Sequence, residues 1–199
     1  MKIILIGASG TIGKRIYDAF AGKHKIVRAS REGVDVSVDI TSAESIEKMY
    51  KAVDAVDSII CAAGPARFGN FSELSEDDFY VGIRGKMMGQ VNLVRIGQKY
   101  LNDNGSFTLT TGILSDDPVI GSTGLSLVNG AVNSFALAAA QELPRGLRVN
   151  VVCPTVVADS AEVYSDIFPG FDPVPMDRVV NGYLRSVEGK INGRIIRIY

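Results

Sequence analysis

Short runs rich in β-branched residues alternate with helical patterns along the whole chain, and this alternation constrains the fold more than any other feature. Seven such runs are present, at residues 2–6, 25–29, 36–39, 58–62, 106–110, 148–152 and 194–199. Most are apolar on both faces, as expected of parallel strands that helices cover on either side. The alternation predicts one doubly wound α/β sandwich of three layers, spanning residues 1–199.

The segments between the runs predict helices and one long loop. The two longest helices are expected at 79–101 and 124–143. Thr41 with Glu44 has the spacing of a capping box, and Ser75 can cap the turn that follows it. Residues 154–175 carry four prolines and weak periodicity, which predicts a long and therefore functional loop.

Charge and cysteine content exclude several classes of function. The formal net charge is −1 with no basic run, so neither nucleic acid nor a membrane surface is an expected partner. No apolar stretch is long enough to span a bilayer. The two cysteines, Cys61 and Cys153, lie inside apolar runs and are interpreted as core residues rather than metal ligands. A cytoplasmic protein without a metal site is therefore expected.

The first apolar run leads directly into GASGTIGKRIYDAF, which places Gly7, Gly10 and Gly13 where a strand turns into a helix. Glycines at such a turn allow the close approach of a pyrophosphate, and the helix N-terminus adds free N–H groups. A plain glycine-rich turn is the alternative. The position after a strand and before an amphipathic helix favours a dinucleotide site.

The end of the second run indicates which dinucleotide binds. An NAD site usually places Asp or Glu there, to bind the ribose 2′-hydroxyl. This chain has Ser30 and Arg31 at that place, although Glu32 follows. Because Arg pairs with phosphate through two hydrogen bonds, NADP(H) is favoured over NAD(H). A solvated Arg on a turn is the alternative.

With these motifs, the whole chain resembles the short-chain dehydrogenases/reductases. GASGTIG is similar to the glycine loop of that family, with its middle glycine one residue early. CAAG at 61–64, PRGLRVNVVCPTVV at 144–157 and the closing INGRIIRIY match further family segments in order. The resemblance implies a Rossmann-type fold with a seven-stranded parallel sheet. It implies a cofactor site made of Gly7, Ser9, Gly10, Thr11, Ile12, Gly13, Ser30, Arg31, Asp39, Ala62, Ala63, Gly64, Pro154 and Val157, with Asp39 at the adenine and Val157 at the carboxamide.

The same resemblance implies that the usual chemistry is altered. The family's catalytic Tyr and Lys fall on Leu125 and Asn129, its Ser falls on Thr111, and its Asn falls on Lys86. Leu125 cannot donate a proton, and loss of a positioned acid costs about 10²–10⁴ in rate. Lys86, Thr111 and Asn129 are the remaining candidates for catalysis.

Each of the three candidates also has a purely structural interpretation. Lys86 can donate a proton or hold an anion, or it can extend from an interface helix to solvent. Thr111 can orient a substrate oxygen or cap a strand end. Asn129 can bind the cofactor ribose or satisfy a backbone group. In the loop, Tyr164 and Phe168 can cover the substrate or simply pack.

Two functions follow from these residues. The first is an NADP(H)-dependent oxidoreductase of short-chain type, acting on a small carbonyl or related compound with an atypical proton donor. The second is an inactive NADP(H)-binding sensor or interaction protein. A homodimer or homotetramer is expected through 79–101 and 124–143, because 124–143 is small or apolar nearly all round and a single sheet covers only one face of a helix.

Overall fold

The computed structural model describes residues 1–32 and 34–199 and shows a single seven-stranded sheet in which every strand pairing is parallel. The strands lie in the order β3-β2-β1-β4-β5-β6-β7. Their bounds are β1 Lys2–Ile6, β2 Lys25–Ser30, β3 Val36–Ser37, β4 Val56–Cys61, β5 Leu101–Thr110, β6 Arg148–Pro154 and β7 Ile195–Ile198. The predicted doubly wound Rossmann-type sandwich is confirmed.

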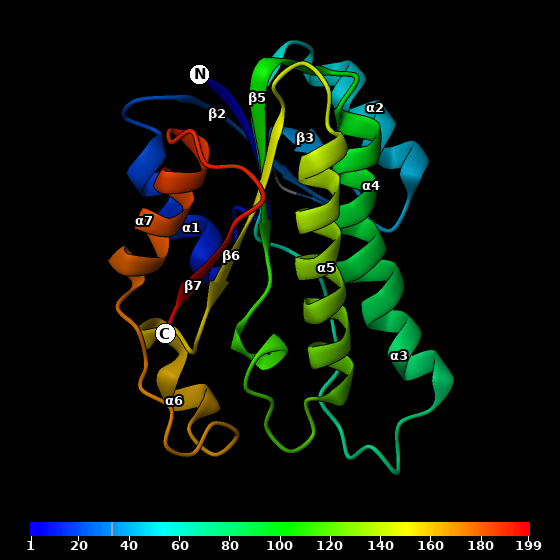
Figure 1. The fold of residues 1–199 in the computed structure, drawn as a ribbon, viewed down its shortest axis with the longest axis vertical. Helices are drawn as coiled ribbons and strands as arrows, with labels where there is room; N and C mark the ends of the chain where they lie inside the picture. Colours follow the sequence, from blue (N-terminus) through cyan, green and yellow to red (C-terminus); the bar gives the residue numbers. More distant parts are fainter. Residues whose placement is uncertain (33) are drawn as a thin grey trace.

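Helices cover both faces of the sheet (Figure 1). One outer layer holds α1 and α7, and the other holds α2, α4 and α5, with α3 extending from α4. Their bounds are α1 Thr11–Phe20, α2 Ala43–Val53, α3 Glu76–Gly82, α4 Met88–Gly97, α5 Thr123–Glu142, α6 Ala161–Tyr164 and α7 Met176–Val187.

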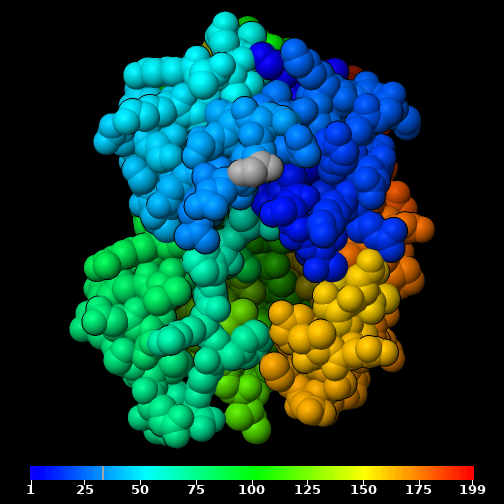
Figure 2. All heavy atoms as spheres, turned by 180° about the vertical axis from the view of Figure 1, so that it is seen from behind, coloured from blue at the N-terminus to red at the C-terminus, as the bar shows by residue number. Residues whose placement is uncertain are grey.

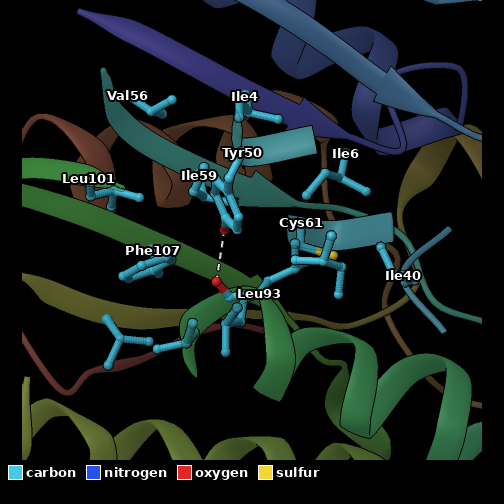
Figure 3. Packing of buried hydrophobic residues seen from close by; sticks show 14 of the residues in the cluster. Ile4, Ile6, Ile40, Tyr50, Val56, Ile59, Cys61, Leu93, Leu101 and Phe107 are labelled. Atoms are coloured by element: carbon cyan, nitrogen blue, oxygen red, sulfur yellow. Dashed lines mark hydrogen bonds between the residues drawn. The ribbon is translucent and has the colours of Figure 1, made fainter. Parts of the chain in front are cut away.

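Strand β1 shows why the sheet is buried on both sides. Ile4 and Ile6 point into the core beneath α2, α4 and α5, whereas Ile3 and Leu5 point into the core beneath α1 and α7. Side chains alternate across a strand, so an unbroken apolar run fills two cores at once. Figure 3 shows part of the first core, where the Tyr50 hydroxyl donates to the carbonyl of Leu93 at 2.7 Å.

The strand order reverses at β1, which has β2 on one side and β4 on the other. In open α/β sheets the ligand crevice lies beyond the carboxyl ends of the strands at such a reversal. The glycine turn after β1 and the CAAG segment after β4 therefore lie together at the expected crevice.

Three local predictions need correction. Ser42 caps α2 by accepting from the Ser45 N–H, while Thr41 donates its hydroxyl to Asp39, so Thr41 is not the cap. The helix expected at 79–101 starts at Glu76 and ends at Gly97, and it contains a π-helical segment, Ile83–Met87. The segment 154–175 is not a bare loop, because it contains a 3₁₀ turn and the short helix α6. The capping box at Ser75 is present, with Asp78 as its partner.

Candidate functional site

The turn after β1 is built to bring a ligand close to the backbone. Gly7 has φ +84°, and a Cβ there would lie 2.7 Å from the carbonyl oxygen of Ala62. A Cβ at Gly13 would lie 2.0 Å from the carbonyl oxygen of Gly7, whereas one at Gly10 would meet its nearest atom only at 3.4 Å. Gly7 and Gly13 are therefore required for packing, and Gly10 leaves room for a ligand.

The N-terminus of α1 opens onto that turn. Gly10 is the N-cap, no side chain of the described residues caps the helix, and its first turn contains no acidic residue. Unpaired N–H groups and the positive end of the helix dipole favour an anion such as a pyrophosphate. The residues present thus fit the phosphates of a dinucleotide.

A cavity of about 390 Å³ lies beside the turn, at the ends of β1, β2 and β4. The residues predicted to hold the adenosine half line it: Gly7, Ser9, Gly10, Ser30, Arg31, Asp39, Ala62, Ala63 and Gly64. Asp39 accepts hydrogen bonds from the backbone N–H and the hydroxyl of Thr41, which lower the pKa of its carboxyl group. Arg28, on the same strand end as Arg31, is already paired with Asp35 at 2.8 Å.

A second cavity of about 340 Å³ meets the first at Ala62, which lines both. It is lined by Lys86, Thr111 and Asn129 together with Thr11, Ile12, Leu125, Pro154 and Val157. Figure 2 shows the opening between the blue N-terminal part, the teal residues near 70 and the yellow segment near 160. The fold thus brings all predicted site residues to one cleft except Gly13, which lines neither cavity.

Lys86 reaches the second cavity from the π-helical segment, which inserts one extra residue into the helix and is frequent at functional sites. Gly64, at φ +141°, allows the loop after β4 to approach closely, since a Cβ there would lie 2.9 Å from Cα of Lys86. The Lys86 side chain is half-buried. Within residues 1–32 and 34–199 its ammonium group has no hydrogen bond or ion pair. Burial lowers the pKa of Lys86 to about 8.

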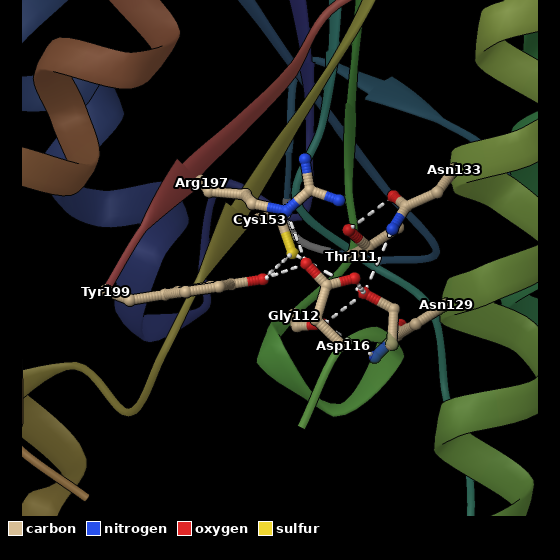
Figure 4. A network of polar contacts seen from close by, with 9 residues as sticks. Thr111, Gly112, Asp116, Asn129, Asn133, Cys153, Arg197 and Tyr199 are labelled. Atoms are coloured by element: carbon tan, nitrogen blue, oxygen red, sulfur yellow. Dashed lines mark hydrogen bonds and ion pairs between the residues drawn. The ribbon is translucent and has the colours of Figure 1, made fainter. Parts of the chain in front are cut away.

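Thr111 lies at the end of β5, and its hydroxyl donates to Oδ1 of Asn133 at 3.0 Å (Figure 4). Nδ2 of Asn133 donates to the Ser115 hydroxyl at 2.9 Å. The Ser115 hydroxyl in turn faces two groups that only accept, the Gly112 carbonyl at 3.1 Å and the Asp116 carboxylate at 3.2 Å. Ser115 therefore donates to one of these acceptors and accepts from Asn133, and Asn133 in turn accepts from Thr111. The Thr111 proton consequently points away from the cavity.

Asp116 continues the same network towards β7. It pairs with Arg197 and accepts from the Tyr199 hydroxyl at 2.9 Å (Figure 4). The guanidinium of Arg197 lowers the pKa of the Asp116 carboxyl group, so this group stays an acceptor at neutral pH. Arg197, on β7, thus helps to fix the direction of the hydrogen bonds that run from Thr111 through Asn133 and Ser115 to Asp116.

Asn129 and Thr155 carry buried oxygens that no described residue pairs with. Asn129 is 2% exposed, its Nδ2 lies 3.4 Å from the carbonyl of Gly112, and its Oδ1 has no hydrogen bond to any residue of 1–32 or 34–199. The Thr155 hydroxyl likewise has no partner among the residues that the structure describes. Both residues line the second cavity. Buried polar atoms are rarely left unpaired, which favours a ligand with hydrogen-bond donors at this place.

Aromatic rings form the outer wall of the second cavity. Phe68, from the loop after β4, meets Phe168 edge to face with centroids 6.4 Å apart. Tyr164 contacts Phe168 in the same way at 6.2 Å. All three line the cavity, Tyr164 and Phe168 from the long loop and Phe68 from the loop after β4.

Sequence reasoning missed Asn133, Gln90, Thr155 and Phe68. Gln90 is fully buried, and its side-chain amide forms two hydrogen bonds with the backbone of Thr110. Nε2 donates to the Thr110 carbonyl, and Oε1 accepts from the Thr110 N–H, which positions the neighbouring Thr111. Asn129 and Asn133 are four residues apart on the face of α5 that also carries Val128, Val132 and Ala136. Two amides at helical spacing on an apolar face were the signal that could have revealed Asn133.

In the described part of the chain, no three His, Cys, Asp or Glu side chains gather as metal ligands. None of the helices described is both long and apolar enough to cross a membrane.

The sheet, the glycine cradle and the crevice at the strand reversal are those of the Rossmann class. The family model described as enoyl-(acyl carrier protein) reductase matches residues 16–174. The chain belongs to this family of short-chain dehydrogenases/reductases, which are oxidoreductases.

Individual relatives agree with this assignment. The oxidoreductase UcpA of Escherichia coli K12 is 26% identical over 162 residues, covering 78% of this chain and 60% of UcpA. The chain therefore spans about three fifths of the length of that curated relative. The crystal structure of the protein lin1944 from Listeria innocua is 44% identical, has a TM-score of 0.98 and covers 100% of both chains. A small-chain dehydrogenase solved in complex with NADPH is 22% identical, with a TM-score of 0.87, and covers 100% of this chain and 96% of that one.

Proposed function

We propose that this protein is an NADP(H)-dependent oxidoreductase of short-chain type in which Lys86 takes the place of the family's catalytic tyrosine as proton donor. The observation that carries the proposal is the position of Lys86. Its unpaired ammonium group lines the same cavity as Thr111, Asn129 and Leu125. Leu125 has no exchangeable proton to give, so the donor has to come from another element.

The cofactor assignment rests on the cleft and on a structural neighbour. The free N–H groups of α1 suit the pyrophosphate, and a neighbour of the same fold was solved with NADPH. Arg31 lines the adenosine cavity and has no ion pair within residues 1–32 and 34–199. An unpaired guanidinium at the end of β2 suits a 2′-phosphate and supports NADP(H) over NAD(H).

The site residues then divide the remaining tasks. When bound, the nicotinamide ring supplies hydride-transfer chemistry. Lys86 Nζ gives the proton that completes the reduction of a carbonyl to an alcohol, and it takes one back in the reverse direction. A pKa of about 8 suits both roles near neutral pH. The unpaired Oδ1 of Asn129 accepts from a ribose hydroxyl, and the lone pairs of Thr111 accept from Lys86 or from the substrate.

The test is oxidation of NADPH, followed by absorbance, with a panel of aldehydes, ketones, 2-oxo acids and imines. The panel also includes an α,β-unsaturated thioester, because the matched family description names an enoyl reductase. We expect turnover that Lys86→Met reduces by about 10²-fold or more. Tyr164→Phe is the matched control, because it removes the phenol that lines the same cavity and should retain activity.

The replacement of tyrosine by Leu125 favours one competing function, a protein that binds NADP(H) without turnover. Tight binding of NADPH with no oxidation by any compound of the panel would support that alternative. A loss of activity in Tyr164→Phe that matches the loss in Lys86→Met would assign the proton to the phenol instead.

A further inference from the structure

The floor of the second cavity carries an uncompensated positive charge. Lys86 is the one charged side chain among the described residues that line it, which include no Asp, Glu, His or Arg. Within the described residues, the Lys86 ammonium group has neither an ion pair nor a hydrogen bond. The titratable groups that interact with it are the thiols of Cys61 and Cys153. A cation that is partly removed from water and has no counter-charge is costly, so a ligand that brings an anion to Lys86 is favoured.

The rest of the cavity is suited to an apolar chain. Its lining includes Phe68, Phe168 and Tyr164 together with the aliphatic side chains of Leu125, Ile113 and Leu114. The whole cavity is about 340 Å³, and the nicotinamide end of the cofactor has to share it. The ligand is therefore small, with one polar end and one apolar end.

The donors of the three candidate catalytic residues place the anion beside the reacting carbonyl. The Thr111 proton is committed to Asn133, and one N–H of the Asn129 amide faces the carbonyl of Gly112. Of these three residues, Lys86 is the one with a charged donor, and its ammonium group has three N–H groups. The proposed proton donor therefore also provides the positive charge, and one ammonium binds both the carbonyl oxygen and the anion when the two are on adjacent carbons.

We infer that the substrates are small 2-oxo acids with an apolar side chain, reduced to the 2-hydroxy acids, with the carboxylate and the keto oxygen both held by Lys86. This inference rests on the proposed function and adds the substrate class to it. The reaction consumes NADPH and one proton and yields NADP⁺.

Binding to the protein–NADP⁺ complex tests the inference without turnover. Calorimetry would compare 4-methyl-2-oxopentanoate with 4-methyl-2-pentanone, which has the same chain and ketone without the carboxylate. We expect the acid to bind about tenfold to a hundredfold more tightly, as for a hydrogen bond between charged groups. Lys86→Met should abolish that difference, and Lys86→Arg should retain part of it.

Two controls separate the site from net charge and from misfolding. Lys48→Met removes a lysine on α2 whose only ion pair in the described chain is with Glu44, and it should leave the preference unchanged. NADP⁺ affinity of Lys86→Met shows whether that variant is folded, and Lys86→Gln serves as a second variant if it is not.

The outcomes distinguish the inference from the proposed function. Three results would overturn the substrate class while NADP(H) binding and ketone turnover still stood. They are equal affinity for the acid and the ketone, binding of neither, and a preference for the acid that survives in both Lys86→Met and Lys86→Gln. Failure to bind NADP(H) at all would overturn the proposed function. Carboxylate binding that depends on Lys86 without any NADPH oxidation would support the ligand class and reject the reaction.

Discussion

The hydroxyl of Thr111 donates to the side-chain oxygen of Asn133 at 3.0 Å, so the residue at the end of β5 offers lone pairs, not a proton, to the cavity. Asn133→Leu should remove this anchor and the bond to Ser115 together. We expect a loss of about 1–3 kcal/mol in the free energy of unfolding, measured with urea, because buried partners are left unpaired. The turnover number should fall while NADP⁺ affinity is kept.

Asn133→Asp is the matched variant, since a carboxylate still accepts from Thr111. It should retain more activity than the leucine variant. Gln141→Leu changes an exposed amide on the same helix and should alter neither stability nor turnover. An Asn133→Leu protein as active as the parent would show that the orientation of Thr111 has no role.

Arg31→Ala should abolish the preference for NADPH over NADH. The contact of one guanidinium with a 2′-phosphate contributes on the order of 1.5–3 kcal/mol, which is roughly tenfold to a hundredfold in affinity. Fluorescence titration with each cofactor measures it. Arg28→Ala is the control, because Asp35 already pairs with that guanidinium. Equal affinities in the unmodified protein would refute the assignment.

Reduction should weaken as the pH rises through about 8. The pKa of Lys86 is lowered from 10.5 to about 8, so the ammonium form exists below that pH and is lost above it. Its neighbours are the thiols of Cys61 on β4 and Cys153 on β6, and burial raises the pKa of Cys61 to about 11, outside this range. kcat/KM for reduction should fall about tenfold per pH unit above 8. A profile flat to pH 10 would exclude Lys86 as the donor.

The family's usual chemistry should need three changes, not two. Leu125→Tyr with Asn129→Lys restores the pair, but the new lysine would share the cavity with Lys86. Two ammonium groups there repel each other, so each disfavours the charged form of the other. Adding Lys86→Asn should give more reduction of simple ketones than the double variant. Assays of the parent and of both variants under one condition decide this, and a double variant that is already the better enzyme would contradict it.

The protein should be a dimer or tetramer through α4 and α5. Leu127 and Leu137 are each 45% exposed on the outer face of α5, and Ala138 lies beside them. Light scattering should give at least twice the 21.3 kDa of one chain. Ala138→Glu should dissociate the oligomer by placing like charges near a two-fold axis. Ala52→Glu, on the exposed side of α2, should not, and a monodisperse monomer of the parent protein would reject the interface.

Most of the fold could be predicted because most strands are apolar on both faces and alternate with helical patterns, a combination typical of a covered parallel sheet. Local capping was harder to predict: Thr41 and Ser42 are adjacent candidates, and Asp39 decides between them by engaging Thr41. The position of Lys86 followed from family resemblance. The partners of Thr111 did not, because Asn133, Ser115 and Asp116 meet only when α5 packs against the turn after β5.

The π-helical segment Ile83–Met87 limits which deletions this protein can tolerate during evolution. One extra residue there turns α3 and α4 by about 100° relative to each other, compared with an unbroken α-helix. Deleting any single residue between 83 and 87 would restore the regular helix but would move either Lys86 out of the cleft or α3 off its contacts. The segment is therefore far less tolerant of a one-residue deletion than a surface turn of helix, and alignments that place a gap there compare residues with unrelated surroundings.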